Sequence, residues 1–170
     1  LGELAPYEIE RKFLIAYPDI AWLESQAACQ RVDILQYYLR STEDREIRIR
    51  SRKLNGHHSY ALTEKSLEGT NKQLVRRQHL SRREWLNLLS QVDPSRREIR
   101  KTRYCYTYQG QYFEIDVYPC WDDQAIVRIE LSHEDAVIDF PPELKVIREV
   151  TGDPTYRNAV IASKPRGATH

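Results

Sequence analysis

Two carboxylates and an ammonium group fall on one face of the stretch Tyr-Glu-Ile-Glu-Arg-Lys-Phe, residues 7–13. In an extended strand, alternate side chains point to opposite faces, so Glu8, Glu10 and Lys12 share one face. Such a row is poorly suited to a hydrophobic core. It suits a wet, charged cavity that binds both a metal ion and an anion. The alternative is a solvent-facing edge strand, where charge protects against aggregation.

A row of arginines marks a second predicted strand, residues 45–53. Arg48, Arg50 and Arg52 alternate with apolar or small residues and therefore share a face. The dipeptide Asn55-Gly56 is a strong hairpin signal and predicts an antiparallel partner over residues 58–65. A planar guanidinium binds two phosphate oxygens at once, so this face can hold a polyanion. The alternative is an ordinary solvated face.

Three later predicted strands, residues 97–108, 111–118 and 125–131, also carry charge on one face and apolar residues on the other. The charged pairs are Lys101 and Arg103, then Glu114 and Asp116, then Arg128 and Glu130. In an ordinary β-sandwich the inward face would be apolar. Charges sorted onto one face of strand after strand instead indicate a polar interior.

Short helices are predicted over residues 20–31, 82–90 and 154–162. Their start signals are Asp19, the capping box formed by Ser81 and Glu84, and Asp153-Pro154. Together with seven or eight strands, they predict an α+β fold. We expect an antiparallel β-barrel that encloses a polar tunnel and is flanked by a few helices.

Length and composition narrow the function classes. A chain of 170 residues predicts a single domain, residues 1–170, although its Leu-Gly start is also expected of a domain excised from a longer chain. A formal net charge of +1 predicts no general attraction to nucleic acid and no sequence-specific binding to it. No apolar run reaches membrane-spanning length. Three scattered cysteines without a secretory signal favour reduced thiols and a cytoplasmic location.

An ordered series of motifs along nearly the whole chain resembles the CYTH superfamily, also called triphosphate tunnel metalloenzymes. The matching residues are Glu8-x-Glu10-x-Lys12, Gln36-Tyr37-Tyr38-Leu39, Arg48-x-Arg50, Lys65, Lys101-Thr102-Arg103-Tyr104, Glu114-Ile115-Asp116, Glu130, Glu149-Val150-Thr151, Tyr156 and Asn158. The resemblance implies an eight-stranded tunnel in which cations hold a triphosphate and carboxylates hold a divalent metal ion.

The resemblance also implies residue roles. It assigns catalysis to Glu8, Glu10 and Lys12. It assigns phosphate binding to Lys12, Arg48, Arg50, Lys65, Arg76 and Arg103. It places Mg²⁺ or Mn²⁺ on Glu8, Glu10, Asp116 and Glu130, and oxygen ligands of this kind are those that hard cations prefer.

Two departures from the family pattern make the site more cationic. The late strand usually reads Glu-x-Glu, whereas here it is Arg128-Ile129-Glu130, a change of two charge units that can weaken or remove a second metal position. The segment after Arg76, usually acidic, is Arg77-Gln78-His79. Both changes favour anion binding over metal binding.

The family resemblance leaves the activity open among several classes. The first is a divalent-metal-dependent triphosphate hydrolase, an acid anhydride hydrolase acting on inorganic tripolyphosphate or a small organic triphosphate. The second is a regulatory domain that binds nucleotide or polyphosphate without turnover. An adenylyl cyclase has less support, because the sequence offers no adenine pocket. Similarity in residues 74–89 and 112–116 to CYTH domains fused to a P-loop domain suggests an attached P-loop nucleotide-binding domain.

Overall fold

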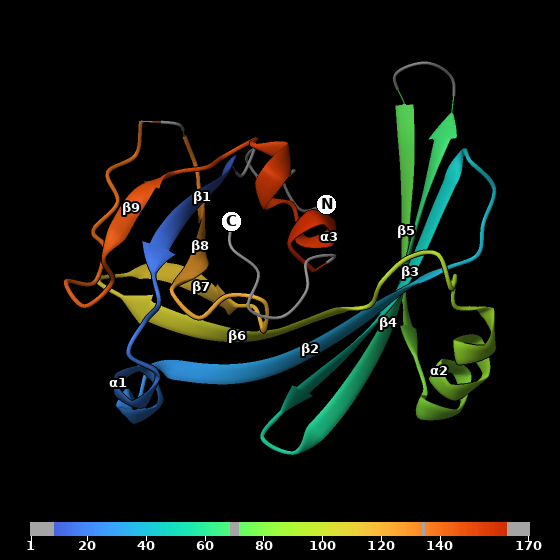
Figure 1. Ribbon diagram of the computed structural model, residues 1–170, viewed down its shortest axis with the longest axis horizontal. Helices are drawn as coiled ribbons and strands as arrows, with labels where there is room; N and C mark the ends of the chain where they lie inside the picture. Colours follow the sequence, from blue (N-terminus) through green and yellow to red (C-terminus); the bar gives the residue numbers. More distant parts are fainter. Residues whose placement is uncertain (1–8, 69–71, 134, 163–170) are drawn as a thin grey trace, which may run out of the picture. The chain divides into compact units, whose positions relative to one another are not determined.

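The computed structural model describes residues 9–68, 72–133 and 135–162 (Figure 1). Its mostly β chain divides into two compact units, residues 1–31 with 102–170 and residues 32–101. The boundaries between the units fall within two long strands, β2 (Cys29–Leu39) and β6 (Ile99–Tyr108). This division into two units does not test the prediction that residues 1–170 form a single domain.

Each strand is antiparallel to its neighbours within a unit. The other strands are β1 (Ile9–Ala16), β3 (Arg45–Leu54), β4 (His57–Glu68), β5 (Lys72–Leu80), β7 (Gln111–Val117), β8 (Gln124–Leu131) and β9 (Val146–Glu149). The helices are α1 (Ile20–Ser25), α2 (Arg82–Leu88) and α3 (Asn158–Ala162), with short 3₁₀ turns η1 (Leu89–Gln91) and η2 (Pro154–Tyr156).

The sheet of the first unit runs in the order β6-β7-β8-β1-β9. One face carries the apolar residues of the strands, including Phe13, Phe113 and Val127, which are buried in a single core. Trp22 of α1 packs edge-on against Tyr106, with ring centroids 5.6 Å apart. Burial of this face leaves a set of charged residues from four strands on the other: Glu10, Lys12, Arg103, Glu114, Asp116, Arg128 and Glu130.

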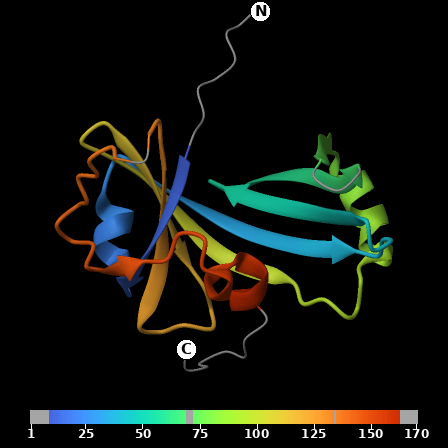
Figure 2. The ribbon, with the colours of Figure 1, turned by 90° about the horizontal axis from the view of Figure 1, so that it is seen from above.

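The sheet of the second unit runs in the order β5-β4-β3-β2, and its strands lie side by side in Figure 2. Its apolar face centres on Leu39, Ile49, Leu80 and Trp85. Trp85 comes from α2, so this helix packs on the apolar face of the sheet. The arginine face of β3 is on the side away from α2.

Local sequence signals set the ends of several elements as expected. Asn55 and Gly56 both have positive φ angles, of 50° and 78°, as a type I′ hairpin requires. The Ser81–Glu84 capping box is formed in both directions: the Glu84 amide donates to Ser81 Oγ, and the Ser81 amide donates to Glu84 Oε1. These turns and caps place β3 against β4 and start α2 beneath the apolar face.

Helix α1 is shorter than the predicted helix over residues 20–31. Asp19 caps it as expected by accepting a hydrogen bond from the Trp22 amide, but the helix ends at Ser25. Gln26 is already extended, and the carbonyl of Ala28 accepts a hydrogen bond from the Thr107 amide. Sheet pairing with β6 therefore replaces the last predicted helical turns with the start of β2.

The described strands number nine rather than the predicted seven or eight. The additional strand is the short β9, which pairs with the outer side of β1. Its residues Val146–Glu149 are all exposed, so hydrophobic alternation could not identify it in the sequence. Among the described residues, no helix is long and apolar enough to cross a membrane.

Candidate functional site

The strand register of the first unit gathers half of the predicted site residues, five of ten, on one face. Glu10 lies opposite Glu130, and Lys12 lies opposite Arg128. On the other side of β8, Arg128 is the register partner of Glu114. Asp116 is paired with Arg103 of β6. Glu8 lies outside the described residues.

Arg103 is held by two carboxylates of β7. Its Nε and Nη2 atoms donate to the two oxygens of Asp116 at 2.8 and 3.1 Å, and Nη1 lies 2.7 Å from Glu114 Oε2. Asp116 is completely buried and the Arg103 side chain is 12% exposed. Burial lowers the pKa of Arg103, but the hydrogen bond and negative charge of Asp116 outweigh it and raise the pKa overall. Arg103 is therefore a fixed cation.

Arg128 bridges the carboxylates of two other strands. Its Nη1 lies 3.2 Å from Glu10 Oε1, and its Nε lies 3.2 Å from Asp116 Oδ2. Nη2 donates to Oδ1 of Asn158 in α3 at 3.0 Å, and the same oxygen accepts a hydrogen bond from the Tyr118 hydroxyl. Burial is the largest single effect and lowers the pKa of Arg128, but Asp116, Tyr118 and Glu10 together outweigh it and raise the pKa overall. The guanidinium is therefore held by three side chains: the carboxylates of Glu10 and Asp116 and the amide oxygen of Asn158.

Lys12 completes the cationic group of this face. Its Nζ lies 3.9 Å from Glu10 Oε1. Burial lowers the pKa of Lys12, and the nearby charge of Arg128 lowers it further, while Glu10 and Asp116 partly offset both effects. The surroundings of Lys12 therefore disfavour its charged form. A bound anion close to Nζ would stabilise that form.

The predicted metal ligands fit a divalent ion only in part. No group of three or more His, Cys, Asp or Glu side chains suited to a metal occurs in the described part of the chain. Glu10 and the exposed Glu130 are register partners and offer two carboxylates to one ion. Asp116 does not offer the same, because its oxygens face the guanidinium groups of Arg103 and Arg128.

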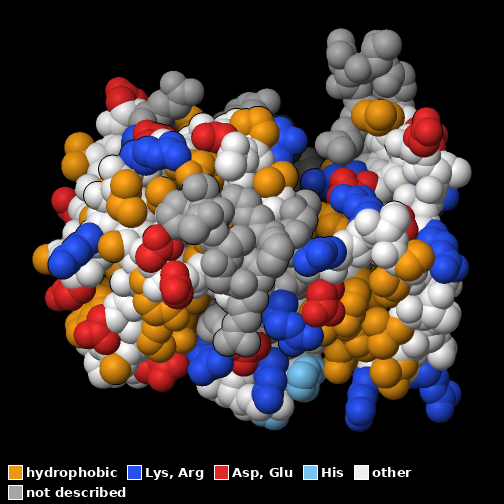
Figure 3. All heavy atoms as spheres, viewed as in Figure 1, with side chains coloured by type: hydrophobic (Ala, Val, Ile, Leu, Met, Phe, Trp, Pro, Cys, Tyr) orange, Lys and Arg blue, Asp and Glu red, His pale blue; other side chains and the backbone are white. Residues whose placement is uncertain are grey.

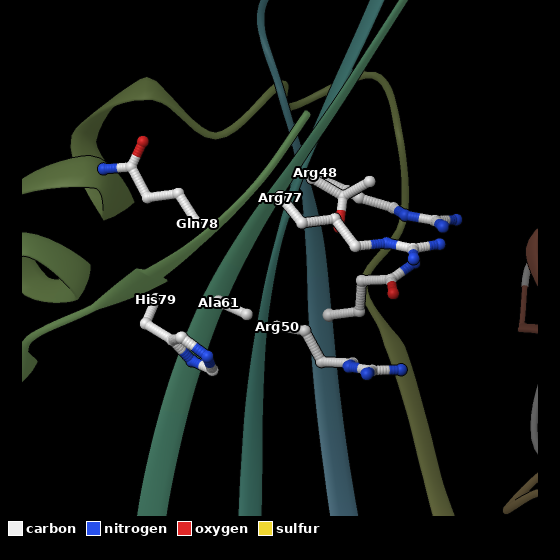
Figure 4. A pocket seen from close by; sticks show the side chains of 8 residues that line it. Arg48, Arg50, Ala61, Arg77, Gln78 and His79 are labelled. Atoms are coloured by element: carbon white, nitrogen blue, oxygen red, sulfur yellow. The ribbon is translucent and has the colours of Figure 1, made fainter. Parts of the chain in front are cut away.

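The second unit carries the predicted arginine pair. Across β2, β3, β4 and β5 the register aligns Gln36, Arg50, Ala61 and His79 in one row. The next row consists of Tyr38, Arg48, Thr63 and Arg77. All of these residues except Tyr38 line a hollow of about 370 Å³. Figure 4 shows the side chains of Arg48, Arg50 and Arg77 extending to the same side of the sheet.

The register corrects the predicted placement of Arg76. Arg76 is paired with Glu64 and lies on the face that carries Ile47 and Leu62, opposite to the face of Arg48 and Arg50. The neighbouring residue Arg77 takes the position expected of Arg76. Residues 74–79 are polar or exposed on both faces of β5, so the sequence offered no alternation from which to choose.

Lys65 lies on the arginine face but further along β4. It is paired with Glu46, and it lines a separate hollow together with Asp44 and Arg96. Gln36 and Asn158 are matching motif residues to which the resemblance assigned no role, and Arg77 and His79 were expected only to make the site more cationic. Only once Leu80 is known to be buried does strand parity place Arg77 and His79 on the arginine face.

Comparison with known proteins identifies the family. No family model and no curated protein matches the sequence. Among solved structures, a crystal structure of the inorganic triphosphatase NE1496 is 29% identical, with a TM-score of 0.64 over 98% of this chain and 100% of that one. A second structure, of the hypothetical protein NE1496, is 30% identical over 93% of this chain and 99% of that one, with a TM-score of 0.60. Similarity at this level over essentially the full length of both chains shows that this chain belongs to the CYTH superfamily of triphosphate tunnel metalloenzymes.

Proposed function

We propose that the protein binds a triphosphate chain through the arginine face of β3 and hydrolyses it. The substrate would be inorganic tripolyphosphate or a small organic triphosphate. The observation that carries the proposal is the convergence of Arg48, Arg50 and Arg77 on one hollow (Figure 4). It is supported by the similarity to a protein named as an inorganic triphosphatase.

The spacing of these arginines suits a linear polyanion. Arg48 and Arg50 are two residues apart on one strand, roughly 7 Å along it, and Arg77 approaches from β5 opposite Thr63. Each guanidinium can donate two hydrogen bonds to phosphate oxygens. On the molecular face seen in Figure 3, basic and acidic side chains are interspersed. The anion preference therefore depends on this local cluster rather than on net charge.

We infer from family membership that the strands form the tunnel for which the superfamily is named. In that arrangement the charged face of the first unit supplies the hydrolytic residues. Hydrolysis adds water across one phosphoanhydride bond: the water oxygen bonds to the terminal phosphorus, the bridging P–O bond breaks, and a proton leaves the water. Glu10 is exposed on this face and can accept that proton, while Lys12 and Arg103 can neutralise phosphate charge.

A divalent ion, Mg²⁺ or Mn²⁺, would be held by Glu10 and Glu130. Glu8, two residues before Glu10, is the third carboxylate expected there from the sequence. When bound, such an ion supplies charge neutralisation and a more acidic water.

The decisive experiment is a substrate panel of tripolyphosphate, ATP, GTP and thiamine triphosphate, each assayed for phosphate release with and without Mg²⁺ or Mn²⁺. We expect metal-dependent release from at least one triphosphate, and its loss in Glu10→Gln. Activity that survives EDTA would contradict the metal requirement. Cyclic AMP formed from ATP would instead indicate a cyclase.

The arginine site has its own binding test. A charge-assisted hydrogen bond is worth about 1.5–3 kcal/mol, so Arg50→Ala should weaken triphosphate binding roughly ten- to a hundredfold by calorimetry. Arg11→Ala is the control, because Arg11 lies on the opposite face of β1 from Lys12 and pairs with Glu149. Equal losses in the two variants would mean that the face assignment is wrong.

A second candidate function is triphosphate binding without turnover, in which the protein regulates an attached domain. The contacts of Arg128 with Glu10 and Asp116 favour it, because they occupy two carboxylates on which a metal-dependent hydrolase would depend. Tight binding by calorimetry, together with no phosphate release with any divalent ion, would establish this function. An attached P-loop domain stays a prediction.

A further inference from the structure

Three of the carboxylates on the charged face of the first unit are paired with cationic side chains. Glu10, Glu114 and Asp116 carry three negative charges on one face, and Lys12, Arg103 and Arg128 supply three positive charges in contact with them. Among these cations, Arg128 is the one that spans two carboxylates on different strands, β1 and β7. It lies where a metal ion bound to both Glu10 and Asp116 would have to lie.

Arg128 is also held in a fixed orientation. Its side chain is only 11% exposed. Asn158 accepts a hydrogen bond from Nη2, and the Tyr118 hydroxyl donates to the same Asn158 oxygen. Tyr118 itself is 1% exposed. A long side chain anchored through an amide and a buried phenol cannot swing away without breaking several contacts, so an incoming ion would not displace it easily.

We propose that Arg128 is a permanent cation that takes the place of a divalent metal ion between Glu10 and Asp116. This inference rests on the proposed function, because it treats this face as the one that meets the triphosphate. Metal binding is then confined to the Glu10–Glu130 pair, and each chain binds at most one ion there.

An arginine in the place of a metal ion can perform only some of the functions of that ion. A guanidinium neutralises phosphate charge and donates hydrogen bonds, as a metal ion neutralises charge by coordination. It has no open coordination position and cannot bind a water molecule to make it more acidic, as a metal ion does. Arg128 therefore contributes to holding the anion and leaves water activation to the carboxylates, to which an ion held by Glu10 and Glu130 would add a more acidic water.

The test is to count bound Mn²⁺ by electron paramagnetic resonance on the full chain without triphosphate. We expect one ion or none for the wild type, without Mn–Mn coupling. Arg128→Glu restores a Glu-x-Glu pair with Glu130, and we expect it to bind one ion more. Arg128→Lys, which keeps the charge, should keep the wild-type count.

Arg83→Glu makes the same change of charge on the exposed surface of α2 and should also leave the count unchanged. Two coupled Mn²⁺ ions in the wild type would overturn the proposal, even if Arg128→Glu failed to fold. A folded Arg128→Glu that gains no ion would overturn it as well. Failure of the proposed function would look different: the Mn²⁺ counts would be as expected, but tripolyphosphate would neither bind nor be hydrolysed.

Discussion

Two adjacent arginines of β5 lie on opposite faces of the sheet. Arg77 is aligned with Thr63 beside Arg48, whereas Arg76 is aligned with Glu64 on the other side. Arg77→Ala should weaken triphosphate binding about tenfold or more, because one bidentate partner is lost. Arg76→Ala should bind as the wild type does. Calorimetry on the two variants tests the register directly, and a greater loss in Arg76→Ala would contradict it.

Replacing the buried Asp116 should lower the free energy of unfolding substantially. Its carboxylate contacts both Arg103 and Arg128 while being completely inaccessible to solvent. Asp116→Asn would leave two largely buried guanidinium groups short of a negative partner, which costs about 3–5 kcal/mol for a buried pair. Urea denaturation should show this loss, whereas Glu130→Gln, at an exposed position, should change the free energy of unfolding by about 0.5 kcal/mol or less. Similar values for both variants would mean that the Asp116 contacts stabilise little.

At the scale of elements, an ion pair joins the edge strand β9 to β1. Arg11 Nη2 and Nε donate to the two carboxylate oxygens of Glu149 at 2.6 and 3.0 Å. The Thr151 hydroxyl donates to the same carboxylate. The Arg11 hydrogen bond is the main reason that the pKa of Glu149 falls from 4.5 to about 2, with Thr151 contributing next.

This shift predicts how stability depends on pH. Because folding lowers the pKa of Glu149, its contribution is complete above the ordinary value of 4.5 and is lost as pH falls toward 2. The Glu149 side chain is 39% exposed, so solvent screening should limit the contribution to about 1 kcal/mol or less. Urea denaturation should find Glu149→Gln less stable than the wild type at pH 7, and the difference should shrink between pH 4 and pH 2. A difference that grows in acid would contradict the assignment.

For the whole molecule, a bound triphosphate should appear as added stability. At a concentration of a hundred times Kd, ligand binding stabilises the folded state by about 2.7 kcal/mol. If Arg50→Ala raises Kd ten- to a hundredfold, the same concentration gives that variant only about 0.4–1.4 kcal/mol. Thermal unfolding with and without tripolyphosphate, in EDTA, measures both values. No stabilisation of the wild type in EDTA would mean that the cations cannot hold the anion without a metal ion.

The sequence by itself determined which residues share a face in most strands. Regular alternation in residues 45–53 and 125–131 separates charge from apolar side chains, and burial of the apolar face then decides the orientation. Hairpins and caps were equally predictable, because Asn55-Gly56 and the Ser81–Glu84 box act through neighbouring residues. Local chemistry of this kind needs no knowledge of the rest of the chain.

Only the tertiary structure decided which charged side chains pair with one another across the strands. Arg128 and Glu10 are 118 residues apart, and only the antiparallel register of β1 and β8 brings them together. Likewise, β5 lacks alternation, so its pairing with β4 had to choose between Arg76 and Arg77. Strand registers across long sequence separations depend on the packing of the whole sheet. A one-residue slip would turn every side chain of a strand to the other face, and a single motif carries no information about that choice.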